Sequence, residues 1–313
     1  MGKRRARMER KAPTLSVVIK NYQYYLMLLP AIVAVFLFDY IPMYGINVAF
    51  REFRFDTGIF AFPWDGWNNF AFFKRFFLWH SFWQLIRNTV VISMLKLVLG
   101  FPIPIVFALM LNELANVRFR RVVQTISYLP HFISWVVVLG ILNQFLAIDG
   151  LLNQSRRAAG LDPIFYLNLR SIFYPMVYFS AVWKNMGYSA IIYVAALAGV
   201  DPALYEAAIV DGASRLRRAW HISLPSILPT IVILFILRFA GILRAGWDQI
   251  YLLRMPGNIS RSQILDTYVI QIGLEGGQFG NATAVALFQS VIGLIMVLAV
   301  NRIAKKVSEV GLF

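Results

Sequence analysis

The chain has 313 residues, of which 59% are hydrophobic and only 14% are charged, and its mean hydropathy is +0.64. Soluble domains are usually closer to half apolar and a quarter charged, so this composition excludes an ordinary soluble protein and indicates a bilayer. The net charge of +15 is typical of a basic rim that faces anionic lipid, an interpretation that we favour over nucleic-acid binding. The absence of cysteine excludes disulfides and thiolate metal sites.

Six apolar runs reach the length of about 20 residues that a helix needs to cross a bilayer. Lipid offers no hydrogen-bond partners to an open backbone, so each run is expected to be helical. The runs are residues 25–44, 88–111, 125–147, 171–198, 226–243 and 282–301. Kinks or broken turns are expected at the prolines within them, namely Pro30, Pro102, Pro104, Pro130 and Pro175. The predicted fold class is an all-α membrane protein with six transmembrane helices.

The distribution of Lys and Arg predicts the orientation of these helices. Lys and Arg are about twice as dense in one set of connections as in the connections on the other side of the helices, and such an excess is typical of the cytoplasmic side. The basic set is residues 1–24, 113–124, 199–225 and 302–313. An even number of spans then places both termini in the cytoplasm. The first run is too long for a signal peptide and no small-residue cleavage site follows it, so we interpret it as a retained helix. The predicted organisation is a basic N-terminal segment, a six-helix domain and a C-terminal tail, at residues 1–24, 25–302 and 303–313.

A polar stretch, EAAIVDGASRLRRAWHISLP, separates the fourth apolar run from the fifth. Asp201 has the character of an N-cap, and Pro202 suits the first helical position that follows it. Gly212 would cost about 1 kcal/mol inside a helix, so it indicates a turn between two short helices, and Pro225 is expected to end the second. Residues 201–225 therefore predict a helix–turn–helix insert that projects into the cytoplasm. An amphipathic linker on the lipid surface is the alternative.

The spacing within this insert resembles the EAA loop of ABC-importer permeases. Glu206-Ala207-Ala208 is followed after three residues by Gly212, and after nine more by Ile222-x-Leu224-Pro225. The resemblance extends over nearly the whole chain, through WNNFAFF, FWQLIRNT, NELANVRFRR, VWKNMGYSA and QFGNATAVALFQ. The chain resembles the permease subunits of binding-protein-dependent ABC sugar importers, in the oligosaccharide and polysaccharide branch of the maltose-type family. The positions that this resemblance marks for coupling to an ATPase are Glu206, Ala207, Ala208, Asp211, Gly212, Ile222, Leu224 and Pro225.

This resemblance implies a fold, a set of partners and a task. The fold would be that of the ABC-importer permeases, with residues 201–225 seated in a groove of a separate ATPase subunit. The partners would be a second homologous permease, two ATPase subunits that bind ATP and Mg, and an extracytoplasmic solute-binding protein, in the bacterial inner membrane. The substrate would be an oligosaccharide or polysaccharide, with an acidic uronate-type glycan such as alginate as one option. This chain would hold no cofactor of its own.

Several other classes of protein find less support in the sequence. It contains no G-x-x-x-x-G-K-[ST] phosphate loop, so the chain is not expected to be the ATPase itself. His80, His131 and His221 lie far apart and have no metal-ligand spacing, so no metal site is predicted. An ion-coupled secondary transporter would need a carboxylate well inside spans two to six, where the sequence has none. An ABC permease for another small solute, such as glycerol phosphate or a peptide, shares every coupling feature and stays open.

Ionisable residues inside the predicted spans are candidates for a substrate pathway, because burying them in lipid is costly. Lys184 is the most informative, because it lies in the polar and aromatic stretch WKNMGY. Its side chain would either make an interhelical hydrogen bond or ion pair, or line a cavity whose aromatic rings stack on sugars. Lys96, Lys184, Arg238 and Asp39 all qualify as candidates; Asp39 is expected to reach the interface, whereas Lys96 could snorkel only over a longer distance from the middle of its span. The candidate pathway residues are Trp183, Lys184, Asn185, Tyr188, Arg238, Trp247 and Asp248.

The outer connections contain two further patterns. Fourteen of the thirty-one residues 53–83 are aromatic, which predicts an aromatic belt at the membrane–water interface. Some of these rings could instead form a mouth that receives sugar from a binding protein, and residues 244–281 are the other candidate docking surface. The triplet Asn258-Ile259-Ser260 matches a glycosylation acceptor, but so short a pattern arises easily by chance.

Overall fold

The computed structural model describes residues 21–53 and 67–308. The regular structure within these two ranges is helical, which confirms the predicted fold class. Most of the predicted N-terminal segment 1–24, part of the aromatic connection and the last five residues lie outside the described ranges.

Four helical segments of the described chain are long and apolar enough to cross a membrane. They are Tyr22–Ala49, Phe82–Asn112, Trp135–Ala158 and Phe279–Ile303. Two further spans come as bent pairs of helices. Arg170–Ala198 meets Pro202–Val210 at 77°, and Arg215–Ser226 meets Leu228–Phe239 at 64°. When each bent pair is counted as one span, the total reaches the six that the sequence predicts.

The second and third predicted runs each contain a break in regular helix. The second run falls on α5 (Phe82–Val98) and α6 (Pro102–Asn112), which together make the segment Phe82–Asn112. The third run, residues 125–147, is divided between α7 (Val117–Tyr128) and α8 (Trp135–Leu146), which a short 3-10 turn, η4 (Leu129–Phe132), separates, and only α8 belongs to the span Trp135–Ala158. Both breaks contain or precede a proline, as expected. Pro30 and Pro175 behave differently, because α2 (Tyr22–Val35) and α10 (Arg170–Ala198) continue through them.

The polar insert has the predicted helix–turn–helix form. Its helices are α11 (Pro202–Val210) and α12 (Arg215–Arg218), and the Asp201 side chain accepts a hydrogen bond from the Ala203 amide at 3.0 Å. Gly212 has a φ of +75°, a left-handed conformation that glycine adopts without strain. Pro225 lies in α13 (Leu224–Ser226), one residue before the end of the helical segment Arg215–Ser226, and the chain then bends by 64° into the fifth span, as predicted.

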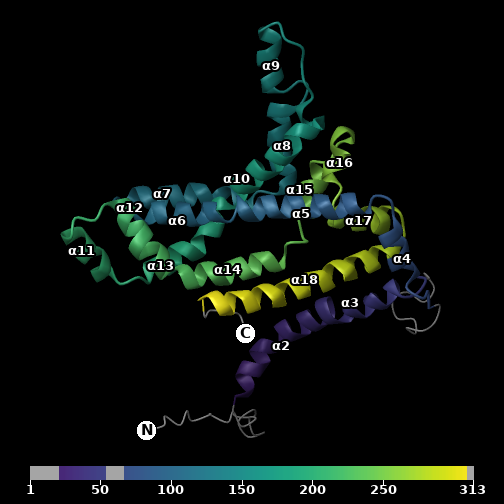
Figure 1. Ribbon diagram of the computed structural model, residues 1–313, viewed down its shortest axis with the longest axis horizontal. Coiled ribbons are helices and arrows are strands. Elements are labelled where there is room, and N and C mark those ends of the chain that lie inside the picture. Colours follow the sequence, from purple (N-terminus) through teal and green to yellow (C-terminus); the bar gives the residue numbers. More distant parts are fainter. Residues whose placement is uncertain (1–20, 54–66, 309–313) are drawn as a thin grey trace.

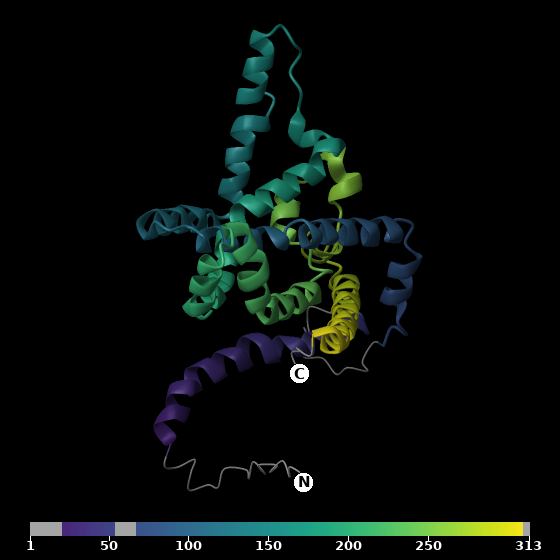
Figure 2. The ribbon, with the colours of Figure 1, turned by 60° about the vertical axis from the view of Figure 1, so that its left-hand side comes forward.

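Most helices run along the long axis of the molecule (Figure 1). The insert helices α11 and α12 lie at one end of this axis, and α4 (Ala71–Leu78) and α17 (Leu265–Ile270) lie at the other. Helices α8 and α9 (Leu151–Ala158) project from one side of the body, and Figure 2 shows the same projection after rotation. Between the two ends lie α14 (Leu228–Ala240) and α18 (Phe279–Ser308), which extends into the predicted C-terminal tail.

Helix α10 is the centre of the packing. Its buried residues Ala190, Tyr193 and Leu197 form one apolar cluster with α6 and with Ile227 before α14. On another side, Gly187 brings α10 against the backbone of α7, because a Cβ at this position would lie only 2.2 Å from the Ser127 carbonyl oxygen. Small residues allow this kind of close helix contact in membranes.

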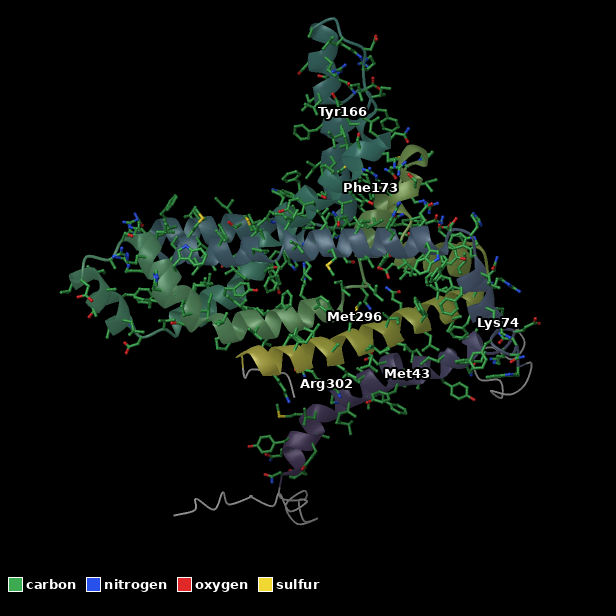
Figure 3. All side chains as sticks on the ribbon, in the orientation of Figure 1. Met43, Lys74, Tyr166, Phe173, Met296 and Arg302 are labelled. Carbon is green, nitrogen blue, oxygen red and sulfur yellow. The ribbon has the colours of Figure 1, made fainter. Side chains whose placement is uncertain are left out.

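The first span is separate from this body. None of the residues of α2 is buried, and Figure 3 shows its side chains standing clear of the other helices over most of its length. Asp39 lies in the π-helical turn η1 (Phe36–Tyr40) and is exposed. Only the end of the span, the 3-10 helix η2 (Tyr44–Ala49), contains buried residues, and it packs against α18.

The aromatic connection divides into packed and exposed rings. Phe76 and Phe82 are buried and meet edge to face at 5.0 Å, and both contact Phe288 of α18. Trp83 is 76% exposed, as a ring at the membrane–water interface would be. Phe76 and Phe82 therefore belong to a small core of the described chain. The prediction of an aromatic belt did not include such a core.

Candidate functional site

A cavity of about 610 Å³ lies between α6, α10, α14 and the short helix α15 (Trp247–Leu252). Its walls come from the break between α5 and α6, from residues 178–193 of α10 and from the C-terminal half of α14. Most of the wall is apolar or aromatic. The polar side chains are few, as is common in cavities that bind small molecules.

Three charged residues line this cavity: Lys96, Arg238 and Asp248. The Lys96 ammonium donates to the Ala245 carbonyl oxygen at 2.7 Å, and the Asp248 carboxylate accepts from the Gln249 amide at 2.9 Å. Arg238 is exposed to the cavity and has no hydrogen bond or ion pair to any residue that the structure describes. The cavity wall therefore has one more positive than negative charge.

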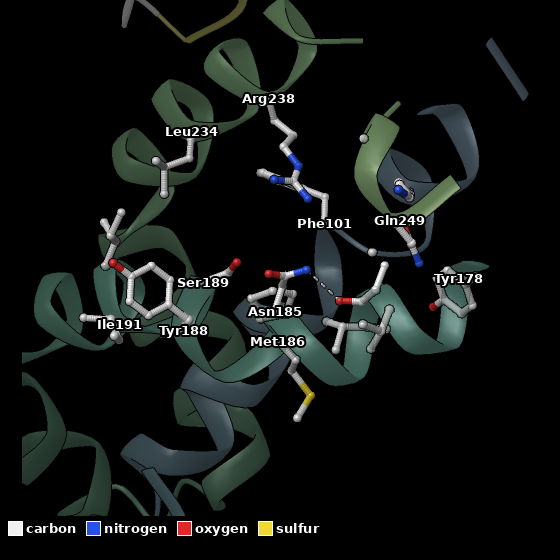
Figure 4. A pocket seen from close by; sticks show the side chains of 18 of the residues that line it. Phe101, Tyr178, Asn185, Met186, Tyr188, Ser189, Ile191, Leu234, Arg238 and Gln249 are labelled. Carbon is white, nitrogen blue, oxygen red and sulfur yellow. Dashed lines mark hydrogen bonds between the residues drawn. The ribbon is translucent and has the colours of Figure 1, made fainter. Parts of the chain in front are cut away.

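Figure 4 shows Arg238 pointing from α14 toward Asn185 on α10. The Asn185 amide donates to the Ala181 carbonyl oxygen at 3.0 Å, and its side-chain oxygen lies 3.1 Å from Nδ1 of His131. Asn185 and Arg238 thus face the same space from two different spans. The two side chains therefore present an amide and a guanidinium to a polar ligand in the cavity.

An aromatic pair covers part of the same wall. The rings of His131 and Tyr188 stack with their centroids 3.8 Å apart and an angle of 3° between their planes. Tyr188 lines the cavity, and His131 belongs to the break in the third span. Sequence reasoning considered His131 only as a metal ligand and missed this contact, since the two residues are 57 positions apart in the chain.

Lys184 lies outside the cavity wall, where it supports the break in the third span. Its ammonium donates to the carbonyl oxygens of Pro130 at 3.3 Å and His131 at 2.6 Å, and also to that of Ile133. It also lies 5.7 Å from the centre of the Trp135 ring. Carbonyls at the end of a helical turn have no partner within the helix, so Lys184 satisfies them. Lys184 therefore makes the interhelical hydrogen bonds of the first interpretation, and it is not a residue of the cavity wall.

The structure thus brings together four of the seven candidate pathway residues. Those that line the cavity are Asn185, Tyr188, Arg238 and Asp248. Those that do not are Trp183, Lys184 and Trp247, of which the two tryptophans are exposed elsewhere. Lys96, a candidate because it lies inside a predicted span, lines the cavity as well. Among the described residues, no three His, Asp or Glu side chains cluster so that they could hold a metal ion.

The insert forms a second candidate site at the end of the molecule (Figure 1). None of the residues of α11 is buried, and Glu206 stands beside exposed apolar side chains: Leu204, Ile209 and Val210 are 50%, 56% and 87% exposed. Asp211, Gly212 and Pro225 are exposed as well, whereas Ala208, Ile222 and Leu224 are half-buried. An exposed apolar surface with one carboxylate is typical of an interaction site.

The connection between α14 and α18 is held by hydrogen bonds of its own. Asn258 is fully buried and its amide donates to the carbonyl oxygens of Leu167 at 3.1 Å and Leu253 at 3.0 Å, so the folded chain does not offer it for glycosylation. The Tyr251 hydroxyl donates to Glu275 at 2.6 Å, and this hydrogen bond raises the pKa of Tyr251. This connection is therefore held in place at the end opposite the insert.

Comparisons with known proteins give a consistent result. The family described as "Binding-protein-dependent transport system inner membrane component" matches residues 100–309. Two relatives from Bacillus subtilis (strain 168) are each 41% identical to this chain. The "Polygalacturonan/rhamnogalacturonan transport system permease protein YteP" aligns over 97% of this chain and 94% of its own length. "Protein LplB" aligns over 92% of this chain and 90% of its own length.

Two solved structures have the same fold. One is a chain of a bacterial ABC transporter involved in the import of the acidic polysaccharide alginate, with a TM-score of 0.83 and 37% identity, over 94% of this chain and 98% of that chain. The other comes from a bacterial alginate ABC transporter in complex with a periplasmic protein that holds an alginate pentasaccharide. Its TM-score is 0.83 and its identity 36%, over 95% of this chain and 99% of that chain.

Proposed function

Because the chain belongs to the family of binding-protein-dependent transport system inner membrane components, we propose a route and a driving mechanism for its substrate. The chain is a permease subunit of an ABC importer for oligosaccharides or polysaccharides. The family membership decides against an ion-coupled secondary transporter. The route is the cavity between α6, α10 and α14, and the driving force enters through the insert at residues 201–225.

The proposed substrate is an acidic glycan. The relative YteP is described as a polygalacturonan/rhamnogalacturonan permease, and the similar solved structure as an importer of alginate; all three glycans contain carboxylates. The observation that carries the proposal is the guanidinium of Arg238 in the cavity, which has no hydrogen-bond or ion-pair partner among the described residues, with Lys96 on another wall. A guanidinium binds a carboxylate through two parallel hydrogen bonds, which are among the strongest polar contacts in proteins.

The remaining lining residues suit the rest of a sugar ring. Tyr188, held on one side by His131, presents a flat aromatic surface on which the apolar face of a pyranose can stack. Asn185 offers both a donor and an acceptor to hydroxyl groups. Recognition by these groups positions a glycan, and the chain forms no covalent bond with it.

The proposed partners follow from the exposed surfaces. Two ATPase subunits that bind ATP and Mg take up the insert, and Glu206 meets a basic group in the groove of one of them. A second homologous permease completes the pathway and covers helices such as α2, which has no buried residue in this chain. An extracytoplasmic solute-binding protein delivers the glycan at the opposite end. This arrangement places the chain in the bacterial inner membrane with both termini in the cytoplasm.

The connection between insert and cavity is direct. Helix α10 lines the cavity and joins α11 through the 77° bend, and α14 lines the cavity and joins the α12–α13 segment through the 64° bend. When ATP binding closes the ATPase subunits, they push the insert and shift both helices. The walls that hold Asn185 and Arg238 then move relative to each other, which opens the cavity outward, and hydrolysis resets it.

The test compares an acidic with a neutral glycan in the intact complex, reconstituted in lipid vesicles. We expect Arg238→Ala to reduce import of an oligogalacturonate about 10-fold or more, since a lost charged hydrogen bond costs about 1.5–3 kcal/mol, and to spare a neutral oligosaccharide. Arg238→Lys keeps the charge and should retain part of the activity, and Arg302→Ala, an exposed arginine of α18 outside the cavity, serves as the control. Equal loss for both glycans would contradict carboxylate recognition. Inhibition by glycerol phosphate or an acidic peptide alone would favour the alternative solutes.

A further inference from the structure

The insert is attached to a third helix, α6, through an ion pair that joins distant parts of the chain. Arg218 of α12 donates from Nη2 to Oε2 of Glu113, the residue that ends α6, at 2.7 Å. Their side chains are only 16% and 15% exposed. The other ion pair among the described residues, Arg157–Asp149, is 46% and 83% exposed. A shielded pair holds its partners more firmly than an exposed one, because water and salt screen it less.

The same region contains a second, weaker attachment. The Tyr205 hydroxyl of α11 lies 2.9 Å from Oγ of Ser223, which is buried in the π-helical segment η6 (Ala219–Ser223). Asn112, in the last turn of α6, donates to the same hydroxyl at 3.4 Å. Arg218 also reaches the Ala213 carbonyl oxygen, beside the turn of the insert, at 3.4 Å. The two halves of the insert are therefore tied to each other and to the end of α6.

The opposite end of α6 forms a wall of the cavity. The helix begins at Pro102 after a break, and the lining residues Gly100, Phe101 and Pro104 belong to this end. A helix of this length spans about 16 Å, so a small push at Glu113 is carried to the break as a rotation of a stiff rod. Pro102 and Pro104 have no N–H to donate to the preceding turn, so the chain can hinge between α6 and α5, in which Lys96 is held by the Ala245 carbonyl.

From these contacts we infer that Glu113 and Arg218 are positioning residues of the transport cycle, which make α6 move together with the insert. This inference rests on the proposed function of the insert. It adds α6 as a third moving wall of the cavity, beside α10 and α14, which are joined to the insert by the chain itself. The pair transmits displacement and does not itself touch the glycan or ATP.

The absence of cysteine from this chain allows a direct test by cross-linking. In the intact complex, the double variant E113C/R218C loses the ion pair, and we expect import per ATP hydrolysed to fall about 10-fold, a typical size for a coupling effect. A short bis-methanethiosulfonate reagent then joins the two thiols. Import per ATP should recover to within about 3-fold of that of the unsubstituted complex, since α6 and the insert are joined again. Dithiothreitol removes the reagent and should remove the recovery. If the joined complex transported no better, or worse, than the open one, the inference would be overturned.

Charge variants give an independent test in the absence of a cross-linker. E113R or R218E places two like charges together and should lower import per ATP, and the exchanged pair E113R/R218E should restore it. D149R at the exposed pair is the matched control and should change nothing. A pair that only stabilised the fold would lower the amount and the thermal stability of the complex, with an unchanged ratio of import to ATP hydrolysis, and that result would also contradict the inference.

Glu206→Lys separates this inference from the proposal on which it rests. This variant should prevent the ATPase subunits from co-purifying, whereas the Glu113 and Arg218 variants should retain them. If Glu206→Lys uncouples the complex and the exchanged charges rescue nothing, the insert keeps its function and the link to α6 is refuted. If Glu206→Lys leaves import driven by ATP intact, the proposed function of the insert fails first.

Discussion

The second and third spans are both broken, and each break has a lysine beside it, yet the two breaks are built differently. At the third span, Lys184 donates to three carbonyl groups, and Gly187 holds α10 against the backbone of α7. At the second span, Lys96 donates to one carbonyl group and faces a cavity. The comparison teaches that a lysine at membrane depth is not by itself a mark of a substrate site; the number of groups that satisfy it decides its role.

The largest expected effect is on the third-span break. Lys184→Met keeps the length of the side chain but removes its donors, so the carbonyls of residues 130, 131 and 133 lose their partner. Interhelical hydrogen bonds in membranes contribute about 0.6–1.7 kcal/mol each, so we expect a loss of about 2–3 kcal/mol. The midpoint of thermal unfolding of the purified complex measures this loss. A normal midpoint would show that Lys184 is not a structural support.

The close contact of α10 with α7 should be the next most sensitive feature. Gly187→Ala places a methyl group where it meets the Ser127 backbone, and we expect a loss of about 1–3 kcal/mol from forced separation of the helices. Gly140→Ala in α8 is the matched control, because no atom lies within 4 Å of its added Cβ. The same thermal measurement applies, and equal midpoints for the two variants would contradict a rigid third-span break.

The sequence predicts the six spans and the insert because hydrophobic length and turn residues are local properties. The third span shows where this information ends. The predicted run, residues 125–147, starts inside α7, which begins at Val117, because Arg118, Arg120 and Arg121 lower the hydropathy without preventing a helix; the span itself begins at Trp135. Hydropathy indicates whether a segment is apolar enough for lipid, but it does not predict where a helix begins or bends.

The candidate site depends on contacts between residues that are far apart in the chain. Arg238 and Asn185 meet across a cavity, and Glu113 meets Arg218 at a separation of 105 residues. A single sequence does not specify such pairs, which is why the role of Lys184 stayed open between two interpretations, and that of Lys96 between a functional site and a side chain that snorkels. The local signals of the insert, an N-cap, a glycine turn and the EAA spacing, needed no distant contact, and the predicted turn at Gly212 is present.

The smallest effect on stability is expected at the second-span break, and it sharpens the comparison most. Lys96→Met removes one hydrogen bond, so the thermal midpoint should change by the equivalent of about 1 kcal/mol or less. It also removes one of the two positive charges of the cavity, so import of an oligogalacturonate should fall while that of a neutral oligosaccharide is retained. Lys184→Met, assayed at a temperature where the complex is folded, should affect both glycans equally. If Lys96→Met unfolded the complex as readily as Lys184→Met, the two breaks would be alike. The cavity would then depend on Arg238 alone for its attraction to carboxylates.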